Sequence, residues 1–163
     1  MIYLDTSALV KLVVRDDETE ALRLHLQTRR TLRPFSSMLA HAELLRAVQG
    51  AGAAAVSTGR LVLSGLDLVD VTREILEAAG SIRTEARLRT LDAIHLATAM
   101  AADDRLVEMI VYDDRLRSAA VARWMASNVR RRASVRMLPA ASRISRVTST
   151  RSRPLSTRRP VLT

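Results

Sequence analysis

The sequence contains no cysteine, and aromatic residues make up only 2% of its 163 residues. Without cysteine the chain has no disulfide bonds and no thiolate metal site, and it suits a reducing compartment. Because aromatic rings are so few, the 48% of hydrophobic residues must build the core mainly from Ala, Leu, Val and Ile. A chain of this length is expected to fold as one domain with a sizeable core.

Long hydrophobic runs are also missing. No run approaches the roughly 20 apolar residues that a membrane-spanning helix needs. The first residues do not show a basic segment followed by a long apolar stretch, so we expect no signal peptide. Together with the lack of cysteine, these absences predict a cytoplasmic protein without a membrane partner.

Negative charge is missing from the C-terminal part of the chain. Residues 115–163 contain 13 arginines and no acidic residue, which gives a net charge of +13. Residues 1–114 contain the other 13 basic residues and all 17 acidic residues, which gives −4. The overall charge of +9 therefore does not identify the body of the protein as a nucleic-acid-binding domain.

Short apolar stretches alternate with stretches of helical periodicity in the first part of the chain. The expected strands are 2–4, 34–37, 66–71 and 107–112, and the expected helices are 6–14, 18–26, 38–49, 53–64, 72–80, 90–102 and one from 114 onward. Strands that alternate with helices indicate an α/β fold with a parallel sheet.

The first strand runs directly into polar residues in the opening stretch MIYLDTSALV. Asp5 is a good helix N-cap, because its side-chain oxygens can accept hydrogen bonds from the free amides of the first turn. It is also placed for function, because the carboxyl ends of parallel strands line the ligand crevice of such sheets. Asp5 alone does not decide between these interpretations.

Further acids occupy comparable positions. Glu43 and Asp92 lie next to apolar residues of predicted helices, and Asp113 and Asp114 follow the apolar stretch MIVY. Each acid alone has a simpler explanation as a cap or a solvated side chain. Several carboxylates that meet at one edge of a sheet would repel one another unless a cation lay between them. Oxygen ligands favour hard divalent ions, Mg²⁺ or Mn²⁺, and such ions can activate water for phosphodiester cleavage.

The segments YLDTSALVKL, SSMLAHAELLRA, LDAIHLATA and VYDDRL together resemble the motifs of PIN-domain ribonucleases, specifically the VapC-type toxins of bacterial toxin–antitoxin pairs. The resemblance covers about residues 1–120, and all four motifs occur in the family's order and spacing. It implies a three-layer α/β/α fold with a central parallel sheet of four to five short strands. It also implies a Mg²⁺- or Mn²⁺-dependent RNA endonuclease that forms a homodimer and is held inactive by a cognate antitoxin.

The resemblance assigns the catalytic and metal-binding acids to four positions of this chain, namely Asp5, Glu43, Asp92 and Asp113. The hydroxyl that supports the first acid falls on Thr6 or Ser7.

Three further residues near these acids have expected roles. Asp113 is preferred over Asp114 as the fourth acid because it directly follows the predicted strand, and Asp114 is expected to cap the last helix. Arg46 either pairs with Glu43 or binds phosphate, and the ion pair is favoured. His95 is interpreted as a helix-packing residue, because hydrolysis assisted by a metal ion needs no histidine base.

The domain is expected to span residues 1–126, followed by a basic tail, 127–163. Its Arg-, Ser- and Thr-rich composition predicts disorder, although ASVRML could add an edge strand. The tail is interpreted either as a basic arm that adds affinity for RNA or as the product of a reading-frame accident. The loss of all acids and of apolar periodicity favours the second, in which case the last strand of the sheet would be missing.

Three functions are compatible with acids at strand ends. The motifs favour an RNA endonuclease over a noncatalytic module that binds RNA or an antitoxin. A phosphoryl-transfer protein is disfavoured, because a receiver needs a late lysine and the only lysine is Lys11. A phosphatase of that class usually has a second Asp where this chain has Ser7.

Overall fold

The computed structural model describes residues 1–83, 88–126, 134–136 and 138. In these residues five parallel strands form one sheet with the order β3-β2-β1-β4-β5. The strands are β1 Ile2–Leu4, β2 Pro34–Ser37, β3 Asp67–Val69, β4 Glu108–Ile110 and β5 Ser134–Arg136. The central strand is thus β1, and the strand order reverses between β1 and β4.

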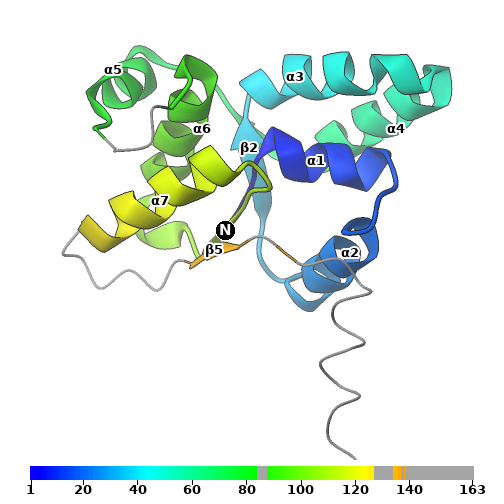
Figure 1. Ribbon diagram of the computed structural model, residues 1–163, viewed down its shortest axis with the longest axis horizontal. Helices are drawn as coiled ribbons and strands as arrows, with labels where there is room; N and C mark the ends of the chain where they lie inside the picture. The colour runs from blue at the N-terminus through cyan, green and yellow to red at the C-terminus, as the bar shows by residue number, and fades with distance from the viewer. Residues whose placement is uncertain (84–87, 127–133, 137, 139–163) are drawn as a thin grey trace, which may run out of the picture.

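Helices cover both faces of this sheet (Figure 1). The helices in the described part of the chain are α1 Thr6–Val13, α2 Thr19–Thr28, α3 Leu39–Val48, α4 Ala53–Ser64, α5 Arg73–Ser81, α6 Thr90–Ala101 and α7 Asp114–Ala126, with 3-10 turns η1 Gln49–Ala51 and η2 Asp103–Arg105. Helices α1 to α4 lie on one side and α5 to α7 on the other, so the expected three-layer α/β/α fold is confirmed. None of these helices is long and apolar enough to cross a bilayer.

The alternation of side chains along β1 divides the core between the two faces. Ile2 and Leu4 pack with the cluster formed by α1, α2, α3 and α4. Tyr3 points to the opposite face and packs with Leu96 and Leu116 of α6 and α7. A three-residue strand can be this apolar because both of its faces are covered by helices.

Most of the expected elements are present. The predictions for β1, β2 and α4 match the structure residue for residue, while the predicted strands 66–71 and 107–112 are longer than the observed β3 and β4. The helix around 38–49 ends at Val48 and continues as the 3-10 turn η1.

The edge strand suggested by ASVRML is also confirmed. β5 pairs in parallel with β4, and Val135 packs against the core cluster on the α6–α7 face. The last strand is therefore present, contrary to what a reading-frame accident would entail. The predicted domain end at residue 126 also leaves out one strand of the sheet. The disorder predicted for the rest of 127–163 lies outside the described residues.

Candidate active site at the carboxyl ends of the central strands

Two of the four predicted acids lie where the strand order of the sheet reverses. β1 leads directly into Asp5, and β4 is followed after two residues by Asp113. In sheets of this type, the crevice outside the carboxyl ends of the strands at that reversal is the usual binding site. The fold thus places Asp5 and Asp113 where a ligand site is expected.

Asp5 is buried and its orientation is fixed by Ser7. One carboxylate oxygen, Oδ2, accepts hydrogen bonds from the backbone N of Ser7 at 3.0 Å and from its hydroxyl at 2.6 Å. The Ser7 hydroxyl in turn accepts the backbone N–H of Tyr112 at 2.8 Å, just beyond β4. Asp5 therefore caps α1, as one interpretation of the sequence allowed, and the same hydroxyl joins the ends of β1 and β4.

Glu43 reaches the end of β1 from α3. Its Oε2 accepts the hydroxyl of Thr6 at 2.5 Å and lies 2.7 Å from Nε2 of His95. Burial would raise the pKa of Glu43, but the hydrogen bonds from His95 and Thr6 outweigh burial and lower the pKa. The two hydroxyls that follow Asp5 thus hold one acid each, Ser7 the first and Thr6 the second.

His95 is the residue of this site that the sequence did not identify. It is 2% exposed, its Nδ1 lies 2.6 Å from the Tyr3 hydroxyl, and the same nitrogen is 3.7 Å from Asp5 Oδ1. Burial would lower its pKa, but the hydrogen bond with Glu43 and the surrounding carboxylates outweigh burial and raise the pKa. The expectation that His95 only packs the helix is therefore incomplete. Tyr3 is the signal that could have revealed this role, because a tyrosine hydroxyl in a fully buried strand needs a hydrogen-bond partner.

Asp92 lies in the first turn of α6, where its Oδ2 accepts the backbone N–H of Arg89 at 3.3 Å. Its pKa is raised, first by burial and further by the negative charges of Asp113 and Asp5. The hydrogen bond and the charge of Arg89 oppose this rise. Asp113 and Asp5 are therefore close enough to Asp92 for their charges to act on its carboxylate.

Asp113 also caps a helix, since its Oδ1 accepts the backbone N–H of Leu116 at 2.8 Å. The expectation that Asp114 is the N-cap of the last helix is therefore wrong. Asp114 is the first residue of α7, is exposed, and pairs with Arg117 at 2.9 Å. A one-residue difference in the start of a helix explains the error, because both positions are favourable for acids.

Arg46 does not form the ion pair that the sequence favoured. It is exposed on α3, and the partners of Glu43 among the described residues are Thr6 and His95. The carboxylate of Glu43 is directed to α1 and α6 by those two hydrogen bonds. Arg46 remains available at the surface one turn beyond the acid.

The donor set of this site suits a hard divalent cation. The four carboxylates supply only oxygen, and the pKa of Asp92 is raised by burial first and then by the charges of Asp113 and Asp5. Within the described residues no three His, Asp or Glu side chains are gathered closely enough to hold one ion. The chemistry of the residues therefore fits Mg²⁺ or Mn²⁺, while the side chains are not arranged around a single point.

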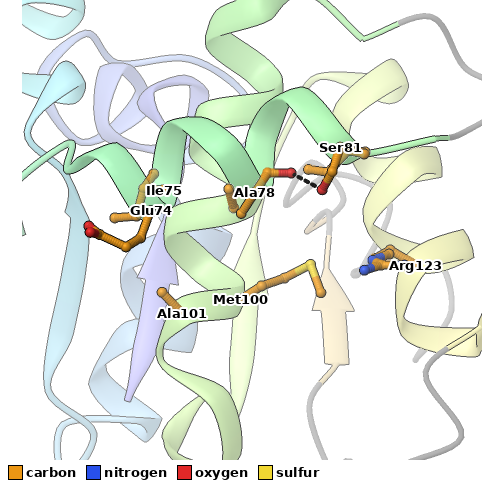
Figure 2. A pocket seen from close by; sticks show the side chains of 9 residues that line it. Glu74, Ile75, Ala78, Ser81, Met100, Ala101 and Arg123 are labelled. Carbon is orange, nitrogen blue, oxygen red and sulfur yellow. Dashed lines mark hydrogen bonds between the residues drawn. The ribbon is translucent and has the colours of Figure 1, made fainter.

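Two cavities elsewhere do not include these acids. One of about 270 Å³ lies between α5, α6 and α7, where Figure 2 shows Glu74, Met100 and Arg123 on its wall. The other, about 370 Å³, is walled by leucines of α1, α2 and α4. None of the four predicted acids lines either cavity. The candidate site is therefore the edge of the sheet itself.

Comparison with known proteins identifies the family. Residues 2–122 match the family described as PIN domain. The chain belongs to the PIN-domain family. Within this family it is of the VapC type, because it is 48% identical over 125 residues to Ribonuclease VapC46 of Mycobacterium tuberculosis (strain ATCC 25618 / H37Rv). That match covers 77% of this chain and 94% of the relative.

Two further relatives and one solved structure agree with this assignment. Ribonuclease VapC35 of the same strain is 41% identical over 128 residues, covering 77% of this chain and 94% of that protein. Ribonuclease VapC47 of M. tuberculosis (strain CDC 1551 / Oshkosh) is 40% identical over 121 residues, covering 72% and 88%. A toxin-antitoxin complex from Klebsiella pneumoniae has a chain with a similar fold, at a TM-score of 0.54 and 22% identity, covering 69% of this chain and 87% of that one.

Proposed function

We propose that this PIN-domain protein is a divalent-metal-dependent RNA endonuclease that acts as the toxin of a toxin–antitoxin pair. The observation that carries the proposal is the group of acids at the carboxyl ends of β1 and β4, where burial raises the pKa of Asp92 and the charges of Asp113 and Asp5 raise it further. The matched relatives, which are named ribonucleases and are aligned over nearly their full length, support RNA as the substrate.

Asp5, Glu43, Asp92 and Asp113 are the residues that would hold Mg²⁺ or Mn²⁺. A bound ion would supply a water of lowered pKa and would stabilise the leaving oxygen of the phosphodiester. Ser7 fixes the carboxylate of Asp5 and Thr6 fixes that of Glu43, through the hydrogen bonds described above. These hydroxyls keep two acids oriented before substrate arrives, which is the contribution of this chain to catalysis.

The partners follow from the same proposal. A cognate antitoxin is the expected inhibitor, and a homodimer in the cytoplasm is the expected form. The helices around 18–26 and 38–49 are candidates for the dimer interface.

The test is cleavage of a mixed, end-labelled RNA pool by the purified protein, with Mn²⁺ or with EDTA, beside Asp92→Asn. Asp104→Asn is the matched control, because it makes the same chemical change at an exposed residue of η2. We expect cutting by the wild type and Asp104→Asn only with Mn²⁺, and no cutting by Asp92→Asn. If folded wild-type protein does not cut RNA under any of these conditions, the noncatalytic binding module becomes the better interpretation.

A further inference from the structure

The ring of His95 is held at both nitrogens inside the protein. Nδ1 lies 2.6 Å from the hydroxyl of Tyr3 on β1, and Nε2 lies 2.7 Å from Oε2 of Glu43 on α3. A buried imidazole with both nitrogens engaged cannot rotate without breaking a hydrogen bond in a medium where water does not replace it. Three elements, β1, α3 and α6, therefore meet at this one ring.

Tyr3 is itself fixed. The ring is 0% exposed, packs edge-on against Phe35 with centroids 5.0 Å apart, and its oxygen accepts the backbone N–H of Ser37 at 3.3 Å. Because that oxygen accepts from Ser37, the phenol proton can be donated to Nδ1 of His95, which leaves Nε2–H to donate to Glu43. The hydrogen bonds of this series are all donated in the same direction, from Ser37 through Tyr3 and His95 to Glu43.

Both hydrogen bonds that Glu43 accepts in the described chain end on the same oxygen. Thr6 and His95 each bond Oε2, at 2.5 and 2.7 Å. A carboxylate held by one oxygen presents the other to a ligand in a defined direction. The same imidazole also lies next to Asp5, whose Oδ1 is 3.7 Å from Nδ1 of His95.

We propose that Tyr3 and His95 are positioning residues that hold Glu43 through Oε2, so that Oε1 is presented to the divalent cation of the site. This inference rests on the proposed function and adds to it a role for two residues that do not touch the metal. Groups that hydrogen-bond metal ligands from behind commonly change metal affinity about 10- to 100-fold when they are removed.

Mn²⁺ binding by the purified, RNA-free protein tests this role. The variants are Tyr3→Phe, which removes only the hydroxyl, His95→Leu, which removes both ring nitrogens, and His95→Gln, whose amide N–H can replace the donor to Glu43. We expect Mn²⁺ to bind about 10- to 100-fold more weakly to His95→Leu and about 10-fold more weakly to Tyr3→Phe. His95→Gln should recover most of the affinity.

Thr98→Val is the matched structural control. Thr98 is buried on the same helix, and its hydroxyl donates to the backbone of Ile94 instead of to the site. We expect it to change the melting temperature while the Kd for Mn²⁺ stays at the wild-type value. A purely structural role for His95 would move the melting temperature alone, as in this control, and would leave the Mn²⁺ affinity of His95→Leu at the wild-type value.

The outcomes separate this inference from the proposed function. Equal Mn²⁺ affinity for the wild type, Tyr3→Phe and His95→Leu would overturn the positioning role and leave the nuclease proposal standing. If His95→Leu does not fold, Tyr3→Phe decides the matter by the same measurement. A folded wild type that binds no Mn²⁺ would overturn both proposals.

Discussion

A buried carboxylate meets a histidine at each end of the sheet, but the two ends differ in how their charges are matched. At the amino end of β4, Glu108 is 1% exposed and lies 2.9 Å from Nε2 of His25 and 3.5 Å from Nε of Arg29. Arg136 of β5 pairs with its other oxygen. One carboxylate there has three basic partners. They connect β4 to the C-terminal end of α2 and to β5.

At the carboxyl end the ratio is reversed. Among the described residues, three of the four acids act on one buried basic side chain, His95, while Arg89 acts on Asp92 from the surface. Breaking a buried ion pair is costly because the remaining charge has no compensation. We therefore expect loss of the Glu108 carboxylate to destabilise the fold, whereas the acidic site carries an excess of negative charge. This excess is what a divalent cation would neutralise.

The largest expected effect is loss of activity on neutralising one acid of the carboxyl end. Asp5→Asn keeps a good N-cap for α1, since Asn is as favourable as Asp there. We expect RNA cleavage to fall more than about 100-fold, beyond the range typical of groups behind metal ligands, while the far-ultraviolet circular dichroism spectrum stays unchanged. Cleavage within a few-fold of the wild type would remove Asp5 from the proposed metal site.

Neutralising the balanced cluster should have the opposite profile. Glu108→Gln removes the shared partner of one histidine and two partly exposed arginines. We expect the free energy of unfolding to fall by about 2 kcal/mol, measured by urea denaturation, with Mn²⁺ affinity unchanged.

The control for that variant is Asp67→Asn, which breaks an exposed pair with Arg33. Such surface pairs contribute less than about 1 kcal/mol, so this change should be small. A Glu108→Gln variant as stable as Asp67→Asn would contradict the structural role of the cluster.

The excess charge predicts a gain in stability for a variant that loses activity. The pKa of Asp92 is raised in the folded state, so its ionised form is destabilising above that pKa, and stability improves as the pH falls toward the usual value. Asp92→Asn should therefore raise the melting temperature of the metal-free protein at neutral pH. The gain in the free energy of unfolding should be less than about 1 kcal/mol, because the site is partly solvated. A lower melting temperature would show that Asp92 is primarily structural.

The smallest expected effect is a pH dependence from His95. Its pKa is raised on folding, so its contribution to stability is fully present below 6.5 and is lost as the pH rises through the folded pKa. Thermal melting of the metal-free protein should show this loss from pH 6.5 upward. Glu43→Gln should flatten the slope, because it removes the hydrogen-bonded carboxylate that raises the pKa. An unchanged slope would assign the effect to another group.

The order of strands and helices was predictable, because short apolar stretches alternate with stretches of helical periodicity. Each strand and the helix that follows it are also specified by consecutive residues. The prediction of Asp5, Asp92 and Asp113 has a related basis, since each follows a strand or begins a helix. Glu43 lies within α3 and was predicted from its apolar neighbours and the resemblance. The exact cap of α7 was not, because Asp113 and Asp114 are equally suitable by type and only the backbone places the first one at the cap.

The contacts that distinguish the two ends of the sheet could not be predicted. Tyr3 and His95 are 92 positions apart, and His25 and Glu108 are 83 apart. Such pairs depend on which faces of distant elements pack together, and local periodicity does not specify that. By sequence, Glu108 is only one residue of the apolar strand predicted over 107–112. An acid within such a strand indicates that it has a buried partner. By sequence, ASVRML is only a possible edge strand, because its pairing depends on β4.

The most direct test of the charge comparison is the shift in melting temperature caused by Mn²⁺ in three proteins, the wild type, the double variant Asp5→Asn/Asp92→Asn and Glu108→Gln. At about 100 times the Kd, bound metal stabilises by about 2.7 kcal/mol, which corresponds to several degrees for a chain of this size, at about 2–4 °C per kcal/mol. We expect that shift in the wild type, the same shift from a lower starting temperature in Glu108→Gln, and none in the double variant. An equal shift in all three proteins, or none in the wild type, would contradict the charge comparison.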